Sequence, residues 1–186
     1  MIIAVVGLGM AAALSLAPAA PAAPDPLGAG LLEITPAGGI FGAQPLFVLR
    51  GAYTISSRIA VEAEIGHNVG DLVSAYLHSA GVRYTCLRYG RAAGFMTLGF
   101  GTFGSAGADA LAAQDITRSH LGLGGGIQIQ IRDDVGARLD LRHHRILLGN
   151  GGDDPGATLG ANEASFGLTF SRRVWSPPPS SGRSTP

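Results

Sequence analysis

Residues 119–144 read SHLGLGGGIQIQIRDDVGARLDLRHH, and this stretch decides the fold. In 120–131 the odd positions hold Leu, Ile and one Gly, whereas the even positions hold His, Gln and three Gly. Because successive strand side chains point to opposite faces, a period of two residues indicates a strand with two different environments. After the polar residues 132–134 the alternation resumes in 135–144, now with charged residues on the even positions. The stretch therefore predicts an antiparallel hairpin.

The same two-residue period recurs along the chain and predicts eight strands. The predicted strands are 31–41, 46–55, 58–67, 74–88, 94–102, 119–131, 135–144 and 163–173. The first is the least regular, because Pro36 and two Gly interrupt it. The links after the second, fourth and sixth strands are short, and those after the third, fifth and seventh are longer. Tight turns at one end and long loops at the other are typical of an outer-membrane barrel, with its turns in the periplasm.

The composition excludes several classes of protein. The 186 residues carry 13 basic and 13 acidic side chains, every basic residue is Arg, and the formal net charge is zero. A nucleic-acid-binding protein would need a net basic surface, so no nucleic acid is expected as a partner. The single Cys rules out an intrachain disulfide framework. Charged residues make up only 14% of the chain, against roughly 25% in soluble domains, which favours contact with lipid.

The two ends of the chain differ from the segment between them. Residues 1–16 are apolar and uncharged, and small residues and Pro follow, which predicts a signal peptide over 1–22 with cleavage before Ala23. A membrane-anchoring helix is the alternative reading of this segment. We expect a short N-terminal linker over 23–30, the barrel over 31–173, and a disordered Pro/Ser-rich tail over 174–186.

The charged side chains concentrate on one set of strand faces. In a membrane barrel the apolar faces meet lipid and the polar faces line the lumen. A buried charge must be paired, because desolvation costs several kcal/mol per ion. The near balance of signs therefore predicts an ion-pair network that plugs the narrow lumen of an eight-stranded barrel. The predicted network consists of Arg50, Arg58, Glu62, Glu64, Arg83, Arg138, Asp140, Arg142 and Glu163.

Several segments resemble the outer-membrane beta-barrel domain family, whose members are small eight-stranded bacterial outer-membrane proteins. The segments are RIAVEAEIG (58–66), FMTLGFG (95–101), LGLGGG (121–126), ARLDLR (137–142) and SFGLTF (165–170). The resemblance implies an all-β, antiparallel, up-and-down transmembrane barrel in the bacterial outer membrane. It also implies two partners, the outer-membrane lipid and the assembly machinery that inserts such barrels.

No group of residues predicts catalysis, a cofactor or a metal site. His143 and His144 are adjacent, so in a regular strand they point to opposite faces and cannot chelate one ion. His78 and Ser79 are separated in the same way, and a nucleophile needs its base within hydrogen-bond reach. We therefore expect a non-enzymatic protein with a structural or surface-interaction role. A lipid-modifying barrel enzyme and a soluble periplasmic lipocalin-like carrier stay open as alternatives, and the sequence names no ligand of the outer loops.

Overall fold

The computed structural model describes residues 29–69, 73–107, 116–147 and 158–174, and within them the chain is all β. The strands are β1 (Leu31–Phe41), β2 (Gln44–Thr54), β3 (Ile59–Val69), β4 (Val73–Tyr89), β5 (Ala92–Gly107), β6 (Ile116–Gln130), β7 (Val135–Leu147) and β8 (Thr158–Arg173). In these ranges no helix is long and apolar enough to cross a bilayer. The predicted signal peptide lies outside the described residues, as do most of the predicted linker and tail.

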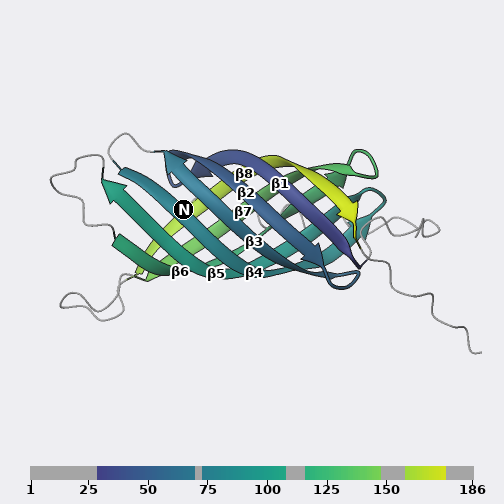
Figure 1. Ribbon diagram of the computed structural model, residues 1–186, viewed down its shortest axis with the longest axis horizontal. Coiled ribbons are helices and arrows are strands. Elements are labelled where there is room, and N and C mark those ends of the chain that lie inside the picture. The colour runs from purple at the N-terminus through teal and green to yellow at the C-terminus, as the bar shows by residue number, and fades with distance from the viewer. Residues whose placement is uncertain (1–28, 70–72, 108–115, 148–157, 175–186) are drawn as a thin grey trace, which may run out of the picture.

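The eight strands form one closed barrel. Each strand pairs antiparallel with the next along the chain, and β1 pairs with β8 to close the sheet. Figure 1 shows the strands running obliquely to the long axis of the barrel. Pro36 lies within β1 and pairs with Leu49 of β2, but the register with β8 passes from Ile34 to Ala37 without it. A proline has no N–H to donate to a neighbouring strand. In β1 this interrupts the pairing with β8 but not the pairing with β2.

Several strands are longer than the sequence pattern predicts, and the largest extensions lie at the end with the longer loops. β5 continues to Gly107, β6 begins at Ile116 and β8 begins at Thr158. These extensions are rich in Gly, Ala and polar residues, so they lack the alternation that marks the strand centres. The extension of β5 pairs with both β4 and β6, whereas that of β6 pairs with β5 and that of β8 with β7. Backbone pairing of this kind does not depend on side-chain character.

At the opposite end all three links are short turns, between β2 and β3, β4 and β5, and β6 and β7. The β4–β5 turn contains Gly90, which has a φ of 55° and so occupies the left-handed region that glycine adopts at little cost. The first link at the loop end is also tight, and it contains Gly42 with a φ of 63°. The other links at the loop end fall in 70–72, 108–115 and 148–157, outside the described residues.

The barrel is polar inside and apolar outside. The inward positions of the strand centres carry buried carboxylates and guanidiniums, and the outward positions carry exposed large apolar side chains. Among the exposed residues are Ile34, Phe47, Leu49, Ile65, Leu98, Phe100, Leu123, Leu141, Phe166 and Phe170. A soluble lipocalin-like carrier would need the reverse arrangement, so that alternative is wrong. An apolar outer surface around a polar lumen is the arrangement of a barrel that spans a membrane.

Candidate functional site

The centre of the lumen is an ion-pair network built on β2, β3, β7 and β8. Arg50 of β2 contacts three carboxylates: its Nε donates to Glu64 Oε2 at 2.9 Å, and its other nitrogens contact Asp140 and Glu163. Arg50 and Glu64 are direct cross-strand partners, as are Arg142 and Glu163. Strand register alone therefore places these opposite charges side by side across the β2–β3 and β7–β8 pairs.

A second part of the network centres on Arg138. Its guanidinium donates to Glu62 Oε2 and to Asp140 Oδ1, each at 2.7 Å. The same group lies 4.5 Å from the centroid of the Phe95 ring, a cation–π distance. Arg142 links the two parts, because it donates to Glu62 at 2.5 Å and to Glu64 at 2.8 Å. The predicted charges of the strand centres thus form one connected set.

A third part lies nearer the short-turn end and includes a carboxylate that the predicted network lacks. Arg83 of β4 pairs with Glu33 of β1, and Gln128 of β6 donates to the other Glu33 oxygen at 2.9 Å. Glu33 is only 1% exposed. Glu33 lies two residues from Leu31 and two from Thr35, which are also buried, so it follows the alternation of β1. The interruption at Pro36 obscured this signal in the sequence.

Arg58 lies outside the lumen, contrary to the prediction. It belongs to the turn between β2 and β3, where it is exposed and donates to the Tyr84 hydroxyl at 3.3 Å. The alternation of β3 begins at Ile59. The sequence pattern was extended by one residue into the turn, and this assigned Arg58 to the inward face. In the turn no strand pairing fixes the direction of its side chain. The other eight predicted residues are buried inside the barrel.

Glycines on the inward face of β6 make room for the long charged side chains of β7. Gly124 is the cross-strand partner of Arg142, and Gly126 is the partner of Asp140. A Cβ added at Gly124 would lie 2.6 Å from Cγ of Arg142. Side chains fill the interior of an eight-stranded barrel, so a bulky neighbour at this position would displace the guanidinium.

The lumen is closed by an apolar layer toward the loop end. Phe41, Leu46, Val48 and Ile146 are buried there and pack together, and the Phe41 ring is stacked on Phe103 with centroids 5.8 Å apart. The same Phe41 ring lies 5.3 Å from the ring of His144. This layer therefore sits directly against the ionic part of the lumen.

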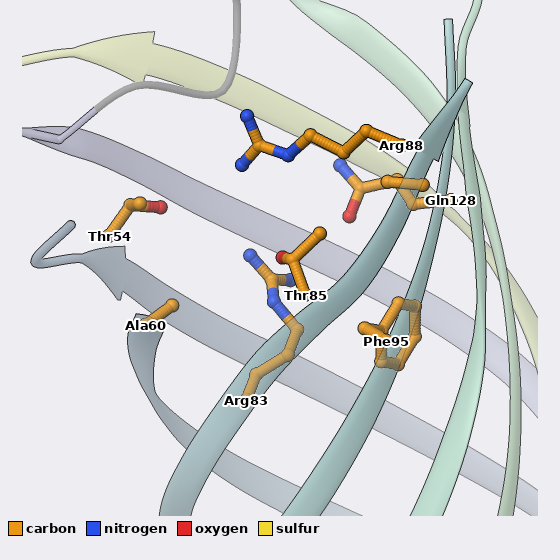
Figure 2. Close-up of a pocket in the computed structure, with 8 residues that line it drawn as sticks. Thr54, Ala60, Arg83, Thr85, Arg88, Phe95 and Gln128 are labelled. Atoms are coloured by element: carbon orange, nitrogen blue, oxygen red, sulfur yellow. The ribbon is translucent and has the colours of Figure 1, made fainter. Parts of the chain in front are cut away.

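Toward the short-turn end the lumen holds a small pocket. Figure 2 shows Arg83, Arg88 and Gln128 converging on it, with Thr54, Thr85 and Phe95 around them. Its volume is about 10 Å³, which is about the space that one water molecule requires. A second pocket, near Glu62 and Arg142, is equally small. Neither of these two pockets has room for a lipid chain or a sugar.

A closed eight-stranded barrel with ions inside and apolar side chains outside is a transmembrane β-barrel of the outer-membrane type. No protein-family model and no curated protein sequence matches the chain. Solved structures do match it. The N-terminal β-barrel domain of Pseudomonas aeruginosa OprF is similar with a TM-score of 0.65 and 14% identity, over 78% of this chain and 99% of that one.

Neisserial surface protein A (NspA) is similar with a TM-score of 0.62 and 11% identity, over 76% of this chain and 97% of that one. Identities this low establish the fold alone. They confirm the eight-stranded outer-membrane barrel and, at the level of the fold, the resemblance to small outer-membrane proteins. The predicted outer-membrane location agrees with this fold and with the apolar outer surface.

Proposed function

We propose that this chain is a non-conducting barrel of the bacterial outer membrane with a structural or surface-interaction role. The observation that carries the proposal is the filling of the lumen: five carboxylates and four guanidiniums, all buried, occupy its centre. The apolar layer around Phe41 and Leu46 closes the loop end. Its partners are then the surrounding lipid, the assembly machinery during insertion, and whatever the outer loops contact.

The ion pairs support a permanent plug. Every guanidinium in the network contacts at least two acidic groups, so moving one would break several contacts at once. Breaking a buried pair typically costs about 3–5 kcal/mol, because an uncompensated charge stays behind. An ion path through the centre would require several such breaks together.

We further propose that the barrel is not an enzyme. The described lumen does bring together a serine, a histidine and an acid, but in the wrong order for nucleophilic catalysis. Ser165 Oγ donates to Glu163 Oε1 at 2.8 Å, and His144 Nε2 lies 3.0 Å from Glu163 Oε2. In a catalytic triad the histidine stands between the nucleophile and the acid, so that it can take the proton of the hydroxyl. Here the acid stands between them, and all three are buried.

Single-channel recording in planar bilayers tests the proposal. The wild-type barrel should give no large, steady conductance after reconstitution. The variant Arg138→Met should give frequent openings, because it removes the contacts to Glu62 and Asp140. Arg145→Met is the matched control, since Arg145 is exposed and points away from the lumen. A steady wild-type conductance would refute the plug.

Mass spectrometry of lipids and lipopolysaccharide incubated with the barrel tests for acyl-chain removal or transfer, which would refute the non-enzymatic role.

A further inference from the structure

One layer of the lumen holds several buried polar atoms without a hydrogen-bond partner. They are Glu64 Oε1, His144 Nδ1 and both ring nitrogens of His120. His120 is fully buried, and Glu64 and His144 are also buried. Buried polar atoms in native proteins nearly always have a partner, and an orphaned group calls for an explanation such as a bound ion. The orphans named here belong to side chains of β3, β6 and β7, and the rings of His120 and His144 are neighbours in the lumen.

Three of the side chains in this layer are arranged as metal ligands. One potential ligand atom from each of Glu64, His144 and Glu163 lies within 4.8 Å of the others. The nearby cations use only part of each carboxylate. Arg50 and Arg142 bind Glu64 Oε2, which leaves Glu64 Oε1 free. Arg50 binds Glu163 through Oε1, and Glu163 Oε2 contacts the His144 ring.

We propose that Glu64, His144 and Glu163 bind one Zn²⁺ inside the barrel, and that His120, which lies outside this group of three but next to His144, turns toward the ion as a fourth ligand. Two carboxylate oxygens and two imidazole nitrogens are donors that Zn²⁺ accepts in a tetrahedral arrangement. The ring centroids of His120 and His144 are 5.3 Å apart. Zinc ligands lie about 2.0–2.2 Å from the ion, so binding requires the three grouped side chains to move together and the His120 ring to move further than they do. The site would join three or four strands around a single ion.

The charge of the lumen supports a cation at this position. Among the buried groups, Glu33, Glu62, Glu64, Asp140 and Glu163 face Arg50, Arg83, Arg138 and Arg142, and this count leaves out Arg118, which is half-buried two residues from His120 on β6. The carboxylates therefore exceed the guanidiniums by one. The positive charges of Arg50 and Arg142 repel a metal ion at this position. Each of these guanidiniums also contacts Asp140, which offsets part of its charge. A proton on His144 would also balance the excess, and the experiment separates that occupant from a metal ion.

Zinc retention by the refolded full chain tests the site. The chain is unfolded with a chelator, refolded in detergent with Zn²⁺, desalted and analysed for metal. Wild type should retain one Zn²⁺ per barrel. His144→Gln and Glu64→Gln should each bind zinc at least ~10-fold more weakly, since even residues that only support a ligand contribute 10–100-fold. His143→Gln is the matched control, because the exposed neighbour His143 points away from the lumen and should leave binding unchanged.

Heat-modifiable gel mobility shows which variants fold, and a Co²⁺ spectrum of the wild type gives a readout that needs no variant. Cobalt in place of zinc should produce the visible absorption of a four-coordinate site with nitrogen and oxygen ligands. A folded wild-type barrel that retains no zinc and gives no such spectrum would overturn the proposal and would favour a proton on His144. Equal loss of zinc in His143→Gln and His144→Gln would overturn it too.

Discussion

Replacing Arg50 by Met is the sharpest test of the ionic lumen. Met keeps much of the length of the side chain but removes the charge that contacts Glu64, Asp140 and Glu163. Arg50 is 1% exposed, so water cannot replace the lost donors. The excess of buried carboxylates rises from one to two. Breaking a buried ion pair by removing one partner costs about 3–5 kcal/mol, and we expect a loss of this size in the free energy of unfolding.

Urea unfolding in detergent micelles, followed by far-ultraviolet circular dichroism and by gel mobility, measures the loss. Arg145→Met is the control: Arg145 is exposed and its Nε contacts only the Thr158 hydroxyl in this strand pair, at 3.3 Å. A surface substitution of this kind changes stability by about 0.5 kcal/mol or less. The double variant Arg50→Met/Glu163→Gln restores the excess to one, so its loss should be smaller than the sum of the single losses, by about 0.5–3 kcal/mol. An Arg50→Met barrel as stable as the Arg145→Met control would refute the reasoning.

Three further predictions concern packing, the outer surface and salt. Gly124→Ala would place a Cβ 2.5 Å from the Leu141 carbonyl oxygen, so it should destabilise the barrel by about 1–3 kcal/mol in the same urea assay, whereas Gly51→Ala, with nothing within 4 Å, should not. Leu98→Arg, at an exposed position near the middle of β5, should cost about 2–4 kcal/mol in lipid vesicles, and Ile131→Arg, at the short-turn end, at most about 1 kcal/mol. Raising the salt concentration should barely alter the urea midpoint of the wild type, because the ion pairs are buried and are screened little; a large shift would place them in water.

The sequence was enough to predict the eight strands and, for all but the first, the side that faces inward. The reason is physical: lipid and a charged lumen demand opposite side chains, and a strand alternates between them at every residue. Strand β7 illustrates this with Arg138, Asp140 and Arg142 at every second position. Only the lumen, and not the lipid, can supply partners for three charges on one face. The partners were predicted only as a set, because the pairing between distant strands depends on register.

The features that the sequence did not predict are those where the alternation stops. Glu33 lies on a strand interrupted by Pro36, and Arg58 lies one residue before the start of β3. The ends of β5, β6 and β8 continue the backbone pairing beyond the point where the alternation of apolar side chains stops. The layer of Glu64, His120, His144 and Glu163 depends on four strands at once, so no local pattern could have assembled it.

An ionic lumen has a cost, since buried ion pairs in soluble proteins can often be replaced by apolar side chains without loss of stability. In this barrel the outer face is already apolar, and an apolar lumen would make both faces of every strand alike. A slip of one residue in strand pairing turns every side chain to the other face. With β7 as it is, such a slip would place Arg138 and Arg142 in lipid, at about 2–4 kcal/mol each near the bilayer centre. The charges therefore distinguish the correct register from its neighbours, a task that apolar packing alone could not perform here.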